Sequence, residues 1–247
     1  MNIKGNTVLI TGGATGIGFA LADAFLKAGN TVIICGRRQE KLDAARNKLQ
    51  GVHTFACDVT KKAERQSLFR WTEEKFPSLN ILINNAGVQG MADLKKGLQG
   101  LPQDVNEVGT NLVAPIHLSA QYTPSFLKKD AAAIINVTSG LGFVPIAAMP
   151  IYCATKAALH SFTLSQRQQL KNTPILVFEI IPPMVATELG GGELGTARGI
   201  KPTALADEVL KAIAGDKFEI PVGEAAGLIE GSRTNFDATF QRLNSWG

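Results

Sequence analysis

The sequence predicts one α/β domain, built on a doubly wound, mostly parallel sheet with helices on both faces. Short apolar runs alternate with helix-like stretches along the whole chain, a pattern typical of strands that are buried on both faces. A glycine-rich segment joins the first apolar run to the first helix. No repeat, low-complexity tract or linker interrupts the sequence, so we expect a single domain over residues 1–247.

Each predicted strand is a run rich in apolar or β-branched residues that ends at a glycine, a proline or a polar residue. Pro182 and Pro183 stop the sixth run, because proline cannot donate a hydrogen bond to a sheet. Seven runs occur, at residues 7–10, 31–35, 52–59, 81–83, 131–137, 175–180 and 218–222.

Helix-like stretches separate these runs, as crossover connections between parallel strands require. Pro115 and Pro124 interrupt the third stretch, since each lacks a backbone N–H group. The stretches cover residues 19–26, 61–75, 103–127, 151–171 and 204–214. This order brings the carboxyl ends of the strands to one edge, where open α/β sheets bind their ligands.

The segment from Thr11 to Gly18 carries the first indication of function. Gly12, Gly16 and Gly18 lie between the first strand and the first helix. Backbone N–H groups at a helix start attract phosphate, and the missing Cβ atoms let a pyrophosphate approach closely. A tight turn without a ligand is the alternative, but a strand and a helix on either side favour a Rossmann-type dinucleotide cradle.

Two arginines indicate which dinucleotide to expect. An acidic residue that binds the adenosine ribose is expected about twenty residues after the glycines. The second strand is followed instead by Gly36, Arg37 and Arg38. Guanidinium groups bind phosphate well, so we predict that NADPH is preferred and that NAD is possible. The alternative is a solvated, basic helix start, although cations there oppose the helix dipole.

Tyr152 and Lys156 form a candidate reaction pair. Residues four apart lie on one face of a helix, so the ammonium can approach the phenol. A cation ~5 Å away, at an effective dielectric constant of ~20, favours the phenolate by roughly 3 kcal/mol, or about two pKa units. We therefore expect a phenol whose pKa is lowered toward neutrality, which suits a general acid. Ser139, at the end of the fifth strand, is expected to lie beside the phenol.

The chain resembles the classical short-chain dehydrogenases/reductases along almost its whole length. The family's glycine motif matches Thr11, Gly12, Gly16 and Gly18, and its Asn-Asn-Ala-Gly motif matches residues 84–87. The resemblance implies the catalytic residues Asn111, Ser139, Tyr152 and Lys156. It implies cofactor contacts at Gly12, Thr15, Gly16, Ile17, Gly18, Arg37, Arg38, Asp58, Val59, Asn85, Ala86, Gly87, Tyr152, Lys156, Pro182, Val185 and Thr187.

Two positions depart from the family pattern. Pro183 replaces a glycine in the segment that contacts the nicotinamide, which stiffens the backbone and removes a donor. Thr15 stands where many NADP-using relatives carry a basic residue, so the expected preference for NADP depends on Arg37 and Arg38.

The resemblance implies an NADP(H)-dependent oxidoreductase that interconverts a carbonyl and an alcohol by hydride transfer. Tyr152 would be the general acid/base, and Ser139 would hold the substrate oxygen. Lys156 would lower the phenol pKa and hold the cofactor ribose, while Asn111 would support a proton-relaying water. The helices at 103–127 and 151–171 would pair into a homodimer or homotetramer.

The substrate is expected to be a small, fairly apolar carbonyl or alcohol compound. A loop at about 188–201, rich in glycine, is expected to be a mobile substrate loop. The apolar residues available to line the pocket are Phe143, Val144, Ile146, Met149, Met184 and Leu189.

Composition argues against several other classes of protein. The net charge of +4 comes from scattered Lys and Arg residues, so we expect neither nucleic acid nor membrane as a partner. His53, His117 and His160 show no metal-ligand spacing, and no metal site is expected. Cys35, Cys57 and Cys153 suggest reduced thiols. The first strand follows Met1 so closely that we expect no signal peptide, and hence a cytoplasmic protein.

Three other functions stay open at this point. The first is a dinucleotide-binding redox sensor without turnover, which would need the cradle but not Tyr152. The second is a dehydrogenase that prefers NAD(H). The third is a sugar-nucleotide epimerase, for which the segment after Pro182 leaves little room for an added substrate domain.

Overall fold

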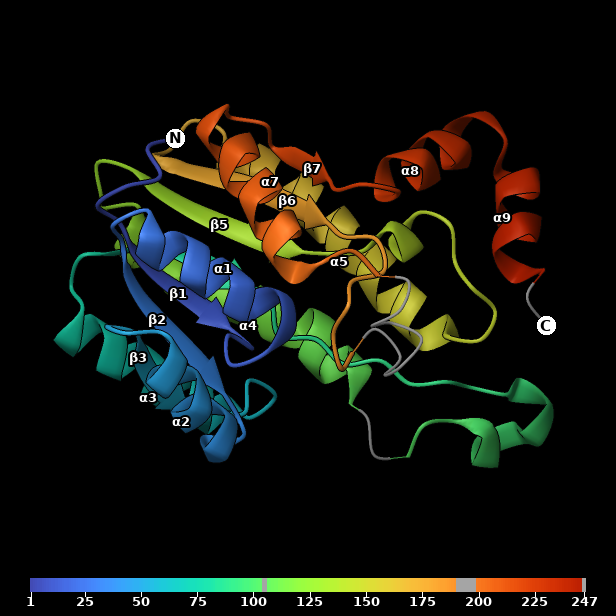
Figure 1. Cartoon of the computed structure of the whole chain (residues 1–247), viewed down its shortest axis with the longest axis horizontal. Helices are drawn as coiled ribbons and strands as arrows, with labels where there is room; N and C mark the ends of the chain where they lie inside the picture. Colours follow the sequence, from blue (N-terminus) through green and yellow to red (C-terminus); the bar gives the residue numbers. More distant parts are fainter. Residues whose placement is uncertain (104–105, 190–198, 246–247) are drawn as a thin grey trace.

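A computed structural model of the chain describes all residues except 104–105, 190–198 and 246–247 (Figure 1). The described residues form a seven-stranded sheet in which every pairing is parallel, with strand order β3-β2-β1-β4-β5-β6-β7. The strands are β1 (Thr7–Thr11), β2 (Thr31–Gly36), β3 (His53–Ala56), β4 (Leu79–Asn84), β5 (Ala132–Val137), β6 (Ile175–Ile181) and β7 (Glu219–Pro221).

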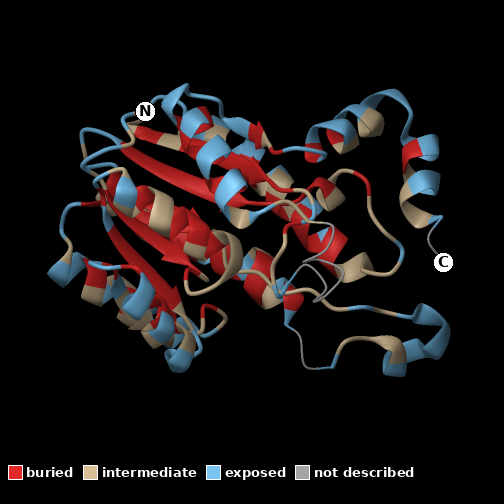
Figure 2. Ribbon diagram, viewed as in Figure 1, coloured by how far each residue is buried: buried red, intermediate tan, exposed pale blue. Residues whose placement is uncertain are grey.

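Helices cover both faces of this sheet (Figure 1). They are α1 (Gly16–Lys27), α2 (Gln39–Lys48), α3 (Lys62–Lys75), α4 (Ala114–Phe126), α5 (Pro150–Gln169), α7 (Pro202–Ala214), α8 (Ala225–Thr234) and α9 (Phe236–Asn244). One apolar cluster joins α1, α2 and α7 to the sheet, and a second joins α3 and α4 to the opposite face. Figure 2 shows the strands buried between these two layers.

The strand order reverses between β1 and β4, because the chain first builds outward to β3 and then returns to the other side of β1. Their neighbouring carboxyl ends form the topological switch point of the sheet, where ligands bind in open α/β folds. Residues 11–18 follow β1 and residues 85–87 follow β4. The doubly wound, parallel architecture predicted from the sequence is therefore confirmed.

Several predicted boundaries were wrong. The third strand was predicted over residues 52–59 but covers only His53–Ala56, so Asp58 lies beyond it. The long helix predicted to start at residue 103 begins close to Glu107, passes through a π-helical turn at Gly109–Val113 and continues as α4. Before it, a 3₁₀ segment at Leu94–Gly100 extends away from the sheet (Figure 1).

Helices α8 and α9 were not predicted, and a helix at the position of α2 was considered only as the alternative interpretation of Arg37 and Arg38. Helix α2 is mostly polar and buries only Leu42 and Ala45. Helix α8 contains Gly227 and Gly231, which favour a loop in a sequence-based prediction. Helices α8 and α9 extend to one side of the sheet (Figure 1). Among the described helices, none has both the length and the apolar character needed to cross a membrane.

A line of buried polar side chains connects α4 to α5 through residues of β4 and β5. Asn84 Nδ2 donates to Ser119 Oγ of α4 (3.1 Å) and to Asn136 Oδ1 of β5 (2.8 Å). Asn136 Nδ2 in turn donates to Thr163 Oγ1 (3.0 Å) and Gln166 Oε1 (3.1 Å) of α5. All five residues are buried. We call this chain of hydrogen bonds the polar ladder.

Candidate active site

The glycine segment after β1 has the geometry of a phosphate cradle. Gly12 and Gly16 have φ angles of +64° and +57°, a region that residues with a Cβ rarely adopt. A Cβ atom at Gly18 would lie 2.4 Å from Asn85 Nδ2 and 2.5 Å from Gly12 O. Helix α1 starts at Gly16, and its N-cap residue, Thr15, makes no side-chain cap. The first N–H groups of α1, including that of Ile17, therefore face the place where a dinucleotide phosphate would bind.

The turn after β4 is held against this cradle. Thr11 Oγ1 accepts hydrogen bonds from the N–H groups of Asn85 and Ala86, both at 3.0 Å. Asn85 Nδ2 donates to the carbonyl oxygens of Thr11 (2.8 Å) and Gly12 (3.3 Å). The structure therefore brings the predicted residues Asn85, Ala86 and Gly12 together, with the Asn85 side chain serving as the connection.

The predicted adenosine end of the site is basic and open. Arg37 and Arg38 follow β2 and are exposed. Asp58 accepts from the N–H and Oγ1 of Thr60 (3.0 and 2.7 Å). Although partial burial raises the pKa of Asp58, the Thr60 hydrogen bonds and the charges of Lys61 and Arg37 bring that pKa below its usual value. Asp58 thus stays charged at neutral pH, and its negative charge interacts with the positive charge of Arg37.

Val59, also predicted as a cofactor contact, is largely buried. Its carbonyl oxygen accepts a hydrogen bond from Arg65 Nη1 at 2.6 Å. The backbone of Val59 is therefore fixed by α3, while Asp58 before it remains half-buried at the edge of the site.

The four predicted catalytic residues form one cluster, of which Asn111 and Lys156 lie next to Gly87. A Cβ atom at Gly87 would lie 3.6 Å from Asn111 Oδ1 and 3.7 Å from Lys156 Nζ. Lys156 Nζ lies 5.7 Å from the centre of the Tyr152 ring and donates to Val137 O at 2.8 Å. Ser139 is close enough to the phenol for a side-chain hydrogen bond that lowers the pKa of Tyr152.

Asn111 occupies the π-helical turn at Gly109–Val113, a local irregularity that often marks a functional site. Its Oδ1 accepts from Val88 N (2.9 Å), and its Nδ2 donates to Val88 O (2.8 Å) and Thr155 Oγ1 (3.1 Å). Thr155 lies beside Lys156 on α5. Asn111 therefore connects the turn after β4 with the helix that carries Tyr152 and Lys156.

The lowered pKa expected for Tyr152 was wrong. The phenol is buried, and burial raises its pKa to about 12, against the weaker effect of the hydrogen bond with Ser139. Burial also lowers the pKa of Lys156, to about 8, because the ammonium loses its water. At neutral pH the phenol is protonated, and the ammonium is still largely charged. Spacing on a helix predicted the contact but could not show how strongly both groups are desolvated.

Glu107 is a charged group near the site that sequence analysis missed. It is 2% exposed, and its Oε1 accepts from Gly90 N at 3.1 Å. Its other carboxylate oxygen, Oε2, has no hydrogen-bond partner among the described residues. Burial raises the pKa of Glu107, and the charge of Glu107 contributes to the raised pKa of Tyr152. It lies four residues before Asn111, a spacing that places two helical residues on one face.

The segment after β6 lies over the start of α1. Pro182 and Val185 are buried, and a Cβ atom at Gly16 would lie 3.1 Å from Thr187 Cγ2. Ile200 pairs with this segment through Ala186 N–Ile200 O (2.9 Å) and Ile200 N–Met184 O (3.1 Å). Most of the predicted mobile loop, residues 190–198, lies outside the described residues.

The apolar pocket predicted from the sequence is only partly assembled. Val144 is fully buried, Phe143 packs on His160, and Met184 and Leu189 are exposed. A cavity of about 400 Å³ does include Ile146; it lies between residues 141–147, the outer side of α5 and Phe240 of α9. The C-terminal helices thus contribute to this apolar region.

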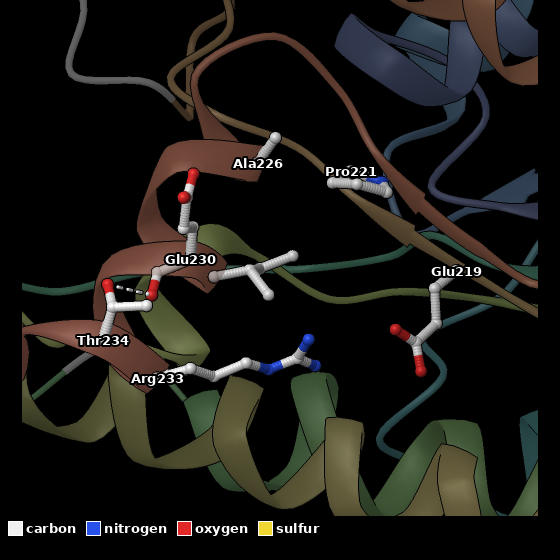
Figure 3. Close-up of a pocket in the computed structure, with 7 residues that line it drawn as sticks. Glu219, Pro221, Ala226, Glu230, Arg233 and Thr234 are labelled. Carbon is white, nitrogen blue, oxygen red and sulfur yellow. Dashed lines mark hydrogen bonds between the residues drawn. The ribbon is translucent and has the colours of Figure 1, made fainter.

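Another cavity, of about 370 Å³, lies between β7 and α8 (Figure 3). Arg233 extends into it, and Glu219 and Glu230 stand at its edges (Figure 3). None of its lining residues is a predicted site residue. The candidate site is therefore the cluster around Gly87, together with the cradle beside it.

This arrangement suits proton transfer beside a bound dinucleotide. The glycines of the cradle leave space free of side chains where a pyrophosphate would lie. The buried phenol of Tyr152 and the buried ammonium of Lys156 lie near the end of β5. In the part of the chain that the structure describes, no group of three His, Cys, Asp or Glu side chains is placed to hold a metal ion.

Known proteins match the chain over most of its length. Residues 6–194 match the family model for short chain dehydrogenases. The uncharacterized oxidoreductase DltE of Bacillus subtilis (strain 168) is 44% identical over 249 residues, which cover 99% of both chains. An uncharacterized oxidoreductase of Staphylococcus aureus (strain MRSA252) is 31% identical over 208 residues, covering 83% of this chain and 89% of the other.

Solved structures share the fold. A short chain dehydrogenase from Burkholderia cenocepacia J2315, in complex with NADP, superimposes with a TM-score of 0.84 at 26% identity, covering 98% of this chain and 99% of the other. A short chain dehydrogenase/reductase from Burkholderia phymatum, in complex with NAD, has a TM-score of 0.83 at 22% identity, covering 99% and 97%. On the matching model, the relatives and the fold, this chain is an oxidoreductase of the classical short-chain dehydrogenase/reductase family.

Proposed function

We propose that this protein is an NADP(H)-dependent oxidoreductase that interconverts a carbonyl compound and an alcohol, with Tyr152 as its general acid/base. The observation that carries the proposal is a single cluster: Asn111 and Lys156 lie next to Gly87, Lys156 lies near the Tyr152 ring, and Ser139 lies near the phenol. A protein that only senses a dinucleotide needs the cradle but not a buried phenol beside a buried ammonium.

The residues of the cradle fit a dinucleotide, because Gly12, Gly16 and Gly18 leave room where a Cβ atom would obstruct it. When bound, the nicotinamide supplies or accepts the hydride. Asn85 and Ala86 would border the pyrophosphate and the adjoining ribose, and Pro182, Val185 and Thr187 would border the nicotinamide.

Tyr152 would give its proton to the substrate oxygen, and Ser139 would hold that oxygen in place. With a pKa of about 12, the phenol is protonated at neutral pH, which is the form needed to protonate a carbonyl oxygen as hydride arrives. Lys156 uses one hydrogen on Val137 O, and its other two would be directed to ribose hydroxyls. Asn111 would keep the turn after β4 aligned with α5 and support a proton-relaying water.

Arg37 and Arg38 support NADP(H) over NAD(H), because both are exposed at the end of β2 and offer charge to a 2′-phosphate. The three buried thiols, none of which is in a disulfide, support a reducing compartment, and we propose the cytoplasm. The segment from Leu141 to Ile146, which follows Ser139, is mostly apolar and supports a fairly apolar substrate.

A homodimer or homotetramer is supported by the outer faces of α4 and α5. Val113, in the turn before α4, and Leu164 of α5 are 36% and 41% exposed, and small residues such as Ala154 and Ala158 would permit close approach. Not every apolar residue of these helices is available, since Leu159 is buried within the chain.

The two tyrosines of the chain allow a matched test of the reaction. Tyr152→Phe should lower kcat by about 10²-fold or more, the usual contribution of a general acid, and should leave the Kd for NADPH nearly unchanged. Tyr122→Phe is the control, because Tyr122 is fully buried against Thr72 of α3 and should affect only stability. Retention of more than about a tenth of kcat by Tyr152→Phe would contradict the assigned role.

A panel of aldehydes and ketones with NADPH tests the enzyme class itself. We expect oxidation of NADPH with at least one apolar carbonyl compound. Binding of NADPH without turnover across a broad panel would favour the redox sensor instead.

Replacing Arg37 and Arg38 by Ala should weaken the binding of NADPH more than the binding of NADH. Arg46→Ala, in the last turn of α2, is the control. Equal losses for both cofactors would contradict the NADP preference.

A further inference from the structure

The carboxylate of Glu188 forms ion pairs with two cationic side chains at the start of α2, Arg38 and Lys41. Its Oε1 is 3.1 Å from Lys41 Nζ, and its Oε2 is 3.5 Å from Arg38 Nη2. Each oxygen thus faces one cation, as two oxygens of a phosphate would. The hydrogen bond and charge of Lys41, together with the charge of Arg38, hold the pKa of Glu188 below its usual value. The group is therefore an anion at neutral pH.

The two cations belong to one turn of helix. Arg38 is the N-cap residue of α2, and Lys41 follows three positions later on the same side. Arg38 makes no side-chain cap, so the positive end of the helix dipole adds to their charge. Their side chains are 46% and 38% exposed, which leaves both accessible to a ligand from solvent.

Glu188 reaches these cations from another part of the fold. It follows Thr187, whose Cγ2 atom lies over Gly16 of the cradle. The same short segment therefore extends from the predicted pyrophosphate position to the predicted adenosine end. A dinucleotide would have to share this space with the Glu188 side chain.

We propose that Lys41 joins Arg38 in binding the adenosine 2′-phosphate of NADP(H), and that Glu188 occupies this phosphate position until the dinucleotide displaces it. The inference rests on the proposed function, which supplies the cofactor. A 2′-phosphate carries up to two negative charges and three acceptor oxygens, against one charge and two oxygens for Glu188. It therefore attracts the two cations more strongly. NAD(H), which has a hydroxyl at this position, lacks the charge needed to displace Glu188.

The test uses two ligands that differ only in the phosphate, adenosine 2′,5′-bisphosphate and adenosine 5′-monophosphate, with affinities measured by calorimetry on the whole protein. Lys41→Gln should weaken the affinity for the bisphosphate about 3- to 10-fold, because a partly exposed charge pair is weaker than a buried one. It should leave the affinity for the monophosphate unchanged. Lys48→Gln, at the other end of the exposed face of α2, makes the same change in net charge and is the control.

Glu188→Gln should act in the opposite direction. Without the competing charge, the bisphosphate should bind about two- to fivefold more tightly, the range expected for an exposed ion pair, and the monophosphate should bind as before. Glu208→Gln, on an exposed position of α7, is the control for net charge.

The outcomes separate this inference from the cofactor preference. If the unmodified protein prefers the bisphosphate but Lys41→Gln behaves like Lys48→Gln, the role of Lys41 is wrong and the NADP preference stands. If Glu188→Gln binds the bisphosphate no more tightly than Glu208→Gln, the competition is wrong. If neither the unmodified protein nor Glu188→Gln prefers the bisphosphate, the proposed NADP preference fails as well.

Discussion

A methyl group at Gly18 should destabilise the fold and disrupt the cradle at the same time. The new Cβ atom would lie 2.4 Å from Asn85 Nδ2 and 2.5 Å from Gly12 O, closer than real Cβ contacts permit. Asn85 would have to move, and its 2.8 Å hydrogen bond to Thr11 O would be lost. Overpacking costs about 1–3 kcal/mol and a lost hydrogen bond about 1 kcal/mol, while the higher helix propensity of Ala in α1 offsets about 1 kcal/mol. Gly18→Ala should therefore reduce the free energy of unfolding by about 1–3 kcal/mol.

For a domain of this size, about 1 kcal/mol shifts Tm by about 2–4 °C, so calorimetry should show a fall of at least about 2 °C. The Kd for NADPH should rise at least about tenfold at a temperature where both proteins are folded, because the displaced Asn85 and Gly12 border the phosphate position. Gly227→Ala is the control: nothing lies within 4 Å of its Cβ position in α8, and the better helix former should raise Tm slightly. A Gly18→Ala protein with unchanged Tm and unchanged Kd would refute this account of the cradle.

Three further predictions concern titration and assembly. The hydrogen bond to the buried Glu179 raises the pKa of His160. The stability that the charged imidazole contributes should therefore be present below about pH 6.5 and lost at higher pH. The difference in unfolding free energy between the unmodified protein and His160→Asn should shrink as the pH rises. Burial raises the pKa of Glu107, which penalises its charged form, so Glu107→Gln should gain stability relative to the unmodified protein as pH rises above about 4.3 in denaturant titrations. Val113→Glu with Leu164→Glu should dissociate the proposed oligomer in light scattering, and an unmodified protein that is already monomeric would contradict that assembly.

The strands and the cradle could be predicted because each depends on local sequence. A short run of mostly β-branched residues that ends at a glycine, such as residues 31–35, favours a buried strand, and Gly12 and Gly16 are needed for their positive φ angles. The proximity of Ser139 to Tyr152 was also predicted, because a strand ends just before Ser139 and the next helix begins near Tyr152. These features need no knowledge of distant contacts.

The remaining features depend on contacts between distant residues. Helix α8 contains Gly231, where a Cβ atom would lie 2.3 Å from Thr239 Oγ1 of α9, so that glycine marks a close approach of two helices and not a loop. The raised pKa of Tyr152 reflects desolvation, which a spacing of four residues does not reveal. Glu107 stands in a polar stretch of sequence, where nothing indicates that its carboxylate is buried.

The polar ladder has a consequence for how far this protein can be altered. Apolar contacts between helices tolerate small shifts along the helix axis, whereas hydrogen bonds between named atoms do not. Sliding α5 by one turn, about 5.4 Å, would leave Asn136 without its partners on that helix. The positions of Tyr152 and Lys156 along the axis are therefore set from inside the chain. The exposed sides of α4 and α5 can be redesigned, for a new partner or for solubility, without resetting the distances around Gly87.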